Sequence, residues 1–246
     1  METVHYLKTG IPGFDELLGK GILRESILTL SGPTGSGKTT FAMQFLVEGA
    51  NKFQEPGLYI SLEDSKKGLL MHMSQFKWEL EKMEARKQLF FLDYPVYEVG
   101  QFLEKENAIG EIVSSMGIER VVIDSIMPIA LSFKDEDHRR KEFLNLISNI
   151  KRWGATTMII SEDTTPVSES IMPTTTYDIE KLSDGWIHLS YMASSKGERE
   201  RGIEIIKMKG TRHSMKKANL ELGDYGFIVL GDPSTTKTTK ERKPKI

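Results

Sequence analysis

Residues 32–39 read GPTGSGKT and match the pattern G-x-x-x-x-G-K-[ST] in every fixed position. Glycines let successive backbone N–H groups wrap around an anion, and the N-terminus of the following helix adds its dipole. In this pattern the lysine, here Lys38, reaches the β- and γ-phosphates of a nucleotide, and the hydroxyl of Thr39 coordinates Mg²⁺. The predicted ligands are therefore ATP or ADP with Mg²⁺. The residues expected to contact them are Thr34, Gly35, Ser36, Gly37, Lys38, Thr39 and Thr40.

Two acidic residues follow short apolar runs. Asp124 ends the run 121–123, and an aspartate at the carboxyl end of a parallel strand can meet the phosphate loop and hold Mg²⁺ through water. The alternative is a cap for the element that follows. Glu63 comes directly after the run 57–61, where a carboxylate can polarise the attacking water as a catalytic base. Its alternative is a helix start capped by Asp64 or Ser65, and both roles can coexist.

The surrounding pattern indicates the elements that must position these residues. Short apolar runs typical of buried strands occur at 27–31, 57–61, 89–93, 120–124 and 156–161. Helical patterns occupy the intervals at 39–51, 65–78, 104–116 and 137–153. This alternation predicts an α/β fold with right-handed βαβ units and a mostly parallel central sheet flanked by helices. Four further runs, at 185–191, 202–207, 219–222 and 226–230, predict antiparallel strands at the C-terminal edge.

Composition limits the function classes further. The chain has no cysteine, which excludes disulfides, thiol catalysis and cysteine-bound metals. The net charge of -2 hides an asymmetry, because residues 196–217 carry +5, residues 231–246 carry +3, and the rest carries -10. No apolar run could span a bilayer and no signal peptide is visible, so we expect a cytoplasmic protein without membrane contact. We expect one domain over 1–232 and a basic, disordered tail over 233–246.

Several motifs beyond the phosphate loop occur in an order and spacing that resemble one family. They are Thr9-Gly10-Ile11-Pro12-Gly13-Phe14-Asp15-Glu16-Leu17-Leu18, Ser61-Leu62-Glu63-Asp64, Val122-Ile123-Asp124-Ser125 and residues 206–213, IKMKGTRH. Over residues 4–230 the chain resembles a single-domain member of the KaiC group of the RecA superfamily. The resemblance implies a RecA-like P-loop NTPase that hydrolyses ATP to ADP and phosphate in a Mg-dependent reaction. It also implies a ring, usually a homo-hexamer, with ATP at the subunit interfaces and the catalytic base within the pair Glu63-Asp64.

The same resemblance gives the basic segment 207–213 a role. It would reach the nucleotide of the neighbouring subunit, with Lys207 and Lys209 as catalytic cations acting in trans and Thr211 and His213 beside that nucleotide. The family often has arginine where this chain has Lys209. Because lysine lacks the bidentate fork, we expect slow turnover, or Lys207 acting alone. The alternative is that both lysines block aggregation at a strand edge.

A second difference from the family concerns phosphorylation. The clock protein of this group has two tandem domains and autophosphorylates a Ser-Thr pair. Aligning Ser183-Asp184 with the family pattern places Glu180-Lys181 at that pair. Since no hydroxyl is present there, we expect no autokinase or clock activity, although Thr174-Thr175-Thr176 leaves phosphorylation nearby open.

The loops that bind single-stranded DNA in recombinase relatives correspond to residues 127–137 and 162–184. These segments carry -2 and -5, whereas a channel for a polyanion should be positive. We therefore favour an ATPase ring acting as a regulatory or signalling module, read by a protein partner that the sequence does not name. The alternatives are a recombinase paralogue that binds single-stranded DNA in repair, and a nucleotide-binding assembly scaffold with negligible turnover.

Overall fold

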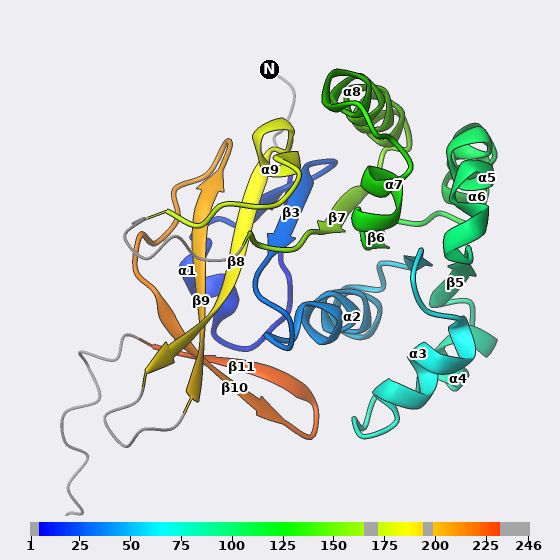
Figure 1. The fold of residues 1–246 in the computed structure, drawn as a ribbon. Coiled ribbons are helices and arrows are strands. Elements are labelled where there is room, and N and C mark those ends of the chain that lie inside the picture. Colours follow the sequence, from blue (N-terminus) through cyan, green and yellow to red (C-terminus); the bar gives the residue numbers. More distant parts are fainter. Residues whose placement is uncertain (1–4, 165–171, 194–198, 232–246) are drawn as a thin grey trace, which may run out of the picture.

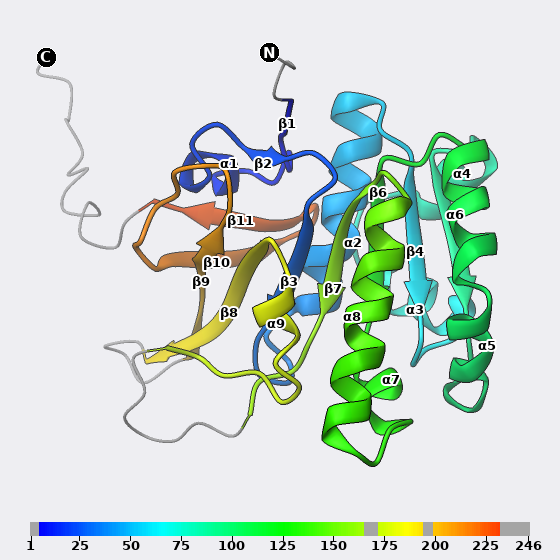
Figure 2. The same ribbon diagram turned by 90° about the horizontal axis from the view of Figure 1, so that it is seen from above.

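A computed structural model describes residues 5–164, 172–193 and 199–231. Its centre is a nine-stranded sheet in the order β11-β10-β9-β8-β3-β7-β6-β4-β5, covered by helices on both sides (Figures 1 and 2). The strands are β3 (Ile27–Ser31), β4 (Gly57–Ser61), β5 (Leu89–Asp93), β6 (Arg120–Asp124), β7 (Thr156–Ile160), β8 (Gly185–Ala193), β9 (Arg199–Met208), β10 (Ala218–Gly223) and β11 (Gly226–Leu230). A separate antiparallel pair consists of β1 (Tyr6–Leu7) and β2 (Ile22–Leu23). The predicted α/β class and mostly parallel sheet are confirmed.

One strand direction differs from the prediction. Strand β8 runs parallel to β3, with Leu28 beside Gly185 and Ser31 beside His188, so the antiparallel part of the sheet begins only at β9. The physical reason is the connection between β7 and β8. Strand β7 ends where the parallel strands end, and β8 starts where they begin, so the chain crosses from one end of the strands to the other between them. A crossover of this kind produces a parallel neighbour, whereas a hairpin would produce an antiparallel one.

The helices form two layers with separate cores. One layer contains α1 (Phe14–Leu17), α2 (Lys38–Glu48), α3 (Lys66–Met73) and α4 (Leu80–Ala85). The other contains α5 (Val99–Glu104), α6 (Glu106–Ser115), α7 (Met127–Leu131), α8 (Glu136–Arg152) and α9 (Ile179–Leu182). Figure 1 shows α2 and α8 on opposite sides of β6 and β7. The sheet is thus covered on both faces, as continuous apolar runs in its central strands require.

One predicted helix is interrupted in the structure, and another is preceded by a short helix that the sequence pattern does not predict. The expected helix 65–78 ends at Met73, and a link containing Phe76 and Trp78 leads to α4. These rings stack at 4.4 Å, and Nε1 of Trp78 donates to the carbonyl of Tyr225 at 3.1 Å. The expected helix 104–116 is observed as α6, and α5 ends at Glu104, just before it. In the first case tertiary anchoring of aromatic side chains overrides the local helical pattern.

Two expectations concern the ends of the chain and membranes. The single domain predicted over 1–232 remains a prediction, and the basic tail 233–246 lies outside the described residues. In the part of the chain that the structure describes, no helix combines the length and apolar character needed to cross a bilayer.

Candidate nucleotide-binding site

The phosphate loop connects the end of β3 to the start of α2. Gly35 and Gly37 have φ angles of 80° and 101°, in the left-handed region that favours glycine. A Cβ atom on Gly37 would lie 2.4 Å from the ring of Phe227 on β11, so this position also requires glycine for space. Backbone amides in such a loop, followed directly by a helix N-terminus, suit the binding of phosphate.

Lys38 lies inside this loop. Its ammonium donates to the carbonyl oxygens of Gly32 at 2.8 Å and Pro33 at 3.3 Å. Burial lowers the pKa of Lys38, while the carboxylates of Glu162 and Asp163 act in the opposite direction. The ammonium therefore stands among acceptors, which phosphate oxygens can replace.

Thr39 and Asp124 meet as the sequence predicts. The Thr39 hydroxyl donates to Oδ2 of Asp124 at 2.9 Å, and the phenol of Tyr59 donates to the same oxygen. Burial raises the pKa of Asp124 to about 6, although both hydrogen bonds oppose the rise. The described residues contain no group of three or more His, Cys, Asp or Glu side chains able to hold a metal unaided. A hydroxyl beside one carboxylate suits Mg²⁺, which is bound through few protein ligands together with phosphates and water.

Glu63 lies at the same edge of the sheet. Strands β4 and β6 are parallel neighbours with Ser61 beside Asp124, and Glu63 follows two residues later. The Glu63 carboxylate is exposed and accepts a hydrogen bond from the Ser125 hydroxyl. The cap of α3 is Ser65, whose side chain accepts from the amide of Gly68 at 3.2 Å. The capping role and the proposed base thus belong to different residues.

The lysines predicted to act in trans lie near the amino ends of the parallel strands, away from the carboxyl ends that carry the phosphate loop. Lys207 on β9 is opposite Trp186, near the start of β8, whereas the phosphate loop follows the end of β3. Its ammonium donates to the carbonyls of Ser183 at 2.6 Å and Glu180 at 3.2 Å, and burial lowers its pKa. Lys209 pairs with Asp184 at 2.9 Å. Neither lysine is placed to reach the phosphate loop of its own subunit.

Thr211 and His213 follow β9 on the same side of the molecule as these lysines. The Thr211 hydroxyl donates to the Leu18 carbonyl at 3.3 Å, and Nε2 of His213 is buried with no hydrogen-bond partner in the described part of the chain. Thr211 lines an open groove whose other residues are Tyr6, Gly19, Lys20, Gly210 and Arg212. Strand β10 pairs with residues 201–203 of β9, so the half that carries Lys207 has an open edge, which the aggregation-blocking alternative also requires.

A buried ion network near the phosphate loop escapes sequence reasoning. His188 on β8 lies between Asp163, which follows β7, and Glu204 on β9. The three residues are separated by up to 41 positions and meet only through the register of the sheet. The alternation of side chains along β8 indicates only that His188 lies on the same face of the sheet as Trp186. It does not identify the two acids that His188 contacts.

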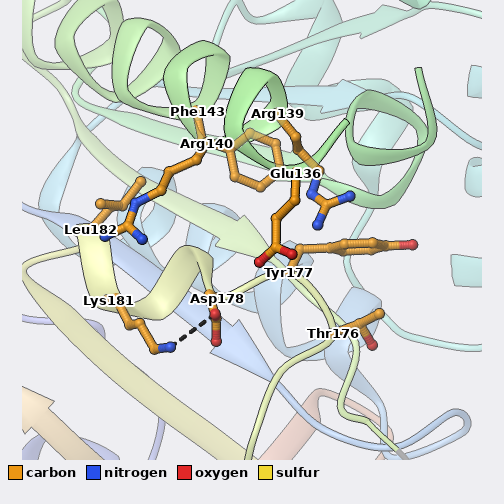
Figure 3. Close-up of a pocket in the computed structure, with 9 residues that line it drawn as sticks. All are labelled: Glu136, Arg139, Arg140, Phe143, Thr176, Tyr177, Asp178, Lys181 and Leu182. Carbon is orange, nitrogen blue, oxygen red and sulfur yellow. Dashed lines mark ion pairs between the residues drawn. The ribbon is translucent and has the colours of Figure 1, made fainter. Parts of the chain in front are cut away.

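A separate cavity of about 70 Å³ lies between α8 and α9. Figure 3 shows Arg139 and Arg140 extending from α8 toward the segment that carries Tyr177 and Lys181. The Arg139 guanidinium lies 5.6 Å from the centre of the Tyr177 ring, and Lys181 pairs with Asp178 at 2.8 Å. This cavity shares no lining residue with the phosphate loop.

The three threonines considered for phosphorylation differ in exposure. Thr174 and Thr176 are exposed, whereas Thr175 is buried and its hydroxyl donates to the carboxylate of Glu180. Glu180 is itself buried. A modifying enzyme could therefore reach Thr174 or Thr176 without unfolding this segment, but not Thr175.

Comparison with known proteins adds the family relationships. A family model described as "ATPase: KaiC" matches residues 7–234. The circadian clock oscillator protein KaiC of Parathermosynechococcus lividus is 32% identical over 92% of this chain, and the chain covers 41% of that relative. The UPF0273 protein of Aeropyrum pernix is 30% identical, with 93% of this chain and 95% of the relative covered.

A solved structure agrees with these sequence matches. The crystal structure of a KaiC-like protein from Pyrococcus horikoshii OT3 is similar with a TM-score of 0.80 at 36% identity. The match covers 93% of this chain and 100% of that one. The chain thus corresponds in length to single-domain relatives and spans less than half of the clock protein.

Proposed function

This chain belongs to the KaiC-like ATPase family of the RecA superfamily, and on that premise we propose that it hydrolyses ATP at the subunit interfaces of a homo-oligomeric ring. One observation carries the proposal. Lys38, Thr39, Asp124 and Glu63 converge at the carboxyl edge of the parallel sheet, where α/β folds bind their ligands. The family and this convergence support ATP as the substrate.

Each converging side chain has a distinct task. The ammonium of Lys38 leaves the loop carbonyls to neutralise phosphate oxygens, and the Glu63 carboxylate accepts a proton from the attacking water. The water oxygen bonds to the γ-phosphorus, and the bond to the oxygen bridging to ADP breaks. Thr39 and Asp124 would hold Mg²⁺, which when bound neutralises charge on the β- and γ-phosphates.

Lys207 on β9 and Lys209, which follows that strand, complete the site from the neighbouring subunit in this proposal. Lys207 and Lys209 lie at the end of the sheet opposite the phosphate loop, so a head-to-tail contact can bring them to the next subunit's nucleotide. Lysine provides a point charge without a bidentate fork, and we therefore expect slow turnover.

We further propose that the ring acts as a regulatory module for a protein partner. The position aligned with the clock protein's phosphorylated pair holds Glu180 and Lys181, and neither carries a hydroxyl. Glu180 is buried against Thr175, so this segment has a fixed charge where the clock protein has a modifiable one. The absence of that pair favours a module whose state does not depend on autophosphorylation at this position.

Particle mass and phosphate release, measured together, test this proposal. With ATP and Mg²⁺ we expect a ring of subunits and steady release of phosphate. The Lys38→Ala variant should bind no nucleotide and release no phosphate, because the loop loses its cation. A monomer under every condition would contradict the interface role of Lys207 and Lys209, and a ring without turnover would favour the scaffold alternative.

A further inference from the structure

His188 lies beside the phosphate loop but outside its motif. It is 7% exposed and pairs in register with Ser31, the last residue of β3 before the loop. Its Nε2 lies 2.9 Å from Oδ2 of Asp163, and its Nδ1 lies 3.1 Å from Oε1 of Glu204. Because each ring nitrogen faces a carboxylate, this arrangement favours the doubly protonated ring, in which both nitrogens donate.

The charges around this ring come from each neighbouring element. Asp163 follows β7, Glu204 lies on β9, and Lys217, next to β10, pairs with Glu204 at 2.9 Å. On the other side β3 contributes the uncharged Ser31. Burial lowers the pKa of His188, but its hydrogen bonds and charge interactions with Asp163 and Glu204 outweigh burial and raise the pKa above its usual value.

Asp163 connects this network to the nucleotide site. Glu162 and Asp163 are the two carboxylates that most strongly favour the charged form of Lys38. One oxygen of Asp163 is held by His188, and the other, Oδ1, is buried and has no hydrogen-bond partner among the residues that the structure describes. A carboxylate so placed adds negative charge near bound phosphates unless a cation compensates it.

We propose that His188 is a positioning residue that holds and neutralises Asp163 beside the phosphate loop and links it through Glu204 to β9. The proposal rests on the assigned nucleotide site. Glu204 precedes Lys207 by three residues on the same strand. The network therefore joins the edge that binds a subunit's own nucleotide to the strand that carries the cations for the next one.

The first test measures binding of a fluorescent ATP analogue to wild type and to His188→Gln. Glutamine leaves Asp163 without a cationic partner, so we expect roughly tenfold weaker binding, as is typical when a buried charged group loses its hydrogen-bond partner. The matched control is His138→Gln, whose side chain is 59% exposed. It should bind as wild type does.

The pH profile separates positioning from a purely structural role. Since the pKa of His188 is raised, the cation is present at low pH and is lost as pH rises through that value. Wild-type affinity should therefore fall as pH rises above about 6.5, the ordinary pKa of histidine, and this fall should be absent from His188→Gln. If the variant does not fold, wild type alone decides, because affinity that stays constant while the His188 ring titrates by NMR overturns the proposal.

Two further variants identify the partners. Asp163→Asn combined with His188→Gln replaces the ion pair by a neutral amide pair and should restore binding to within about threefold of wild type. Glu204→Gln should weaken binding in the same direction as His188→Gln. Unchanged affinity in His188→Gln, or no recovery in the double variant, would refute the positioning role. The binding readout needs no turnover, so a wild type that binds ATP but releases no phosphate would contradict the proposed function alone.

Discussion

Two carboxylates at neighbouring strand ends have contrasting surroundings. Asp124 receives hydrogen bonds from Thr39 and Tyr59, and burial raises its pKa to about 6. Glu63 is exposed and is bonded by Ser125. Different environments of this kind suit the separate tasks that we propose for the two acids, Asp124 as a metal ligand and Glu63 as a proton acceptor in contact with water.

Replacing Glu63 by glutamine tests this division of roles. We expect Glu63→Gln to reduce phosphate release by a factor of roughly 100 or more, because general base catalysis contributes about that much. Nucleotide affinity should stay within about twofold, since the amide keeps the shape of the carboxylate and the side chain is exposed. The control, Glu79→Gln, alters an exposed acid that pairs with Lys82. Turnover equal to wild type in Glu63→Gln, or its loss only in Asp64→Asn, would show that the base is misassigned.

At the scale of elements, one buried arginine forms hydrogen bonds to three separate segments of the chain. The Arg120 guanidinium at the start of β6 donates to Glu55, to the Phe45 carbonyl of α2 at 2.7 Å, and to the Thr9 carbonyl at 3.1 Å. Arg24 also pairs with Glu55. The network holds α2, and with it the phosphate loop, against the sheet.

Arg120→Met should therefore destabilise the fold strongly. The change leaves Glu55 buried with a reduced set of partners, and we expect the free energy of unfolding to fall by about 3–5 kcal/mol. Urea unfolding of the two proteins measures the difference. Lys77→Ala, which removes an exposed ion pair with Asp224, should leave the unfolding midpoint unchanged. Equal midpoints for Arg120→Met and wild type would show that the network contributes no stability.

The sequence predicts some of these elements well for a physical reason. Strands β3, β4, β6 and β7 are almost entirely buried, so each is a mostly apolar run, and the phosphate loop is local in sequence. The direction of β8 depends on a crossover whose course is not encoded in the strand itself. The contacts of His188 depend on register between distant segments, and the break after Met73 depends on anchoring of Trp78 to the β10–β11 hairpin.

For the whole molecule, charge distribution argues against DNA as a ligand. In the structure Asp184 pairs with Lys209, and Asp178 pairs with Lys181. These cations are thus already engaged beside the acidic segment 162–184. No cation of that segment is left unpaired among its described residues, where a DNA channel would need several.

We accordingly predict that single-stranded DNA binds more weakly than micromolar at about 0.15 M salt. Fluorescence anisotropy with a labelled oligonucleotide measures this affinity directly. Micromolar or tighter binding would favour the recombinase alternative. Repeating the measurement without residues 233–246 would then show whether the basic tail is responsible.

The central claim is that each catalytic site combines two subunits, and mixing two inactive variants tests it most directly. Glu63→Gln lacks the proposed base but keeps Lys207 and Lys209. The double variant Lys207→Ala/Lys209→Ala keeps the base but lacks both lysines. In an evenly mixed head-to-tail ring, about a quarter of the interfaces unite an intact Glu63 with intact lysines. We predict that mixing restores about that fraction of wild-type phosphate release. Activity no greater than the sum of the separate variants would contradict a shared site.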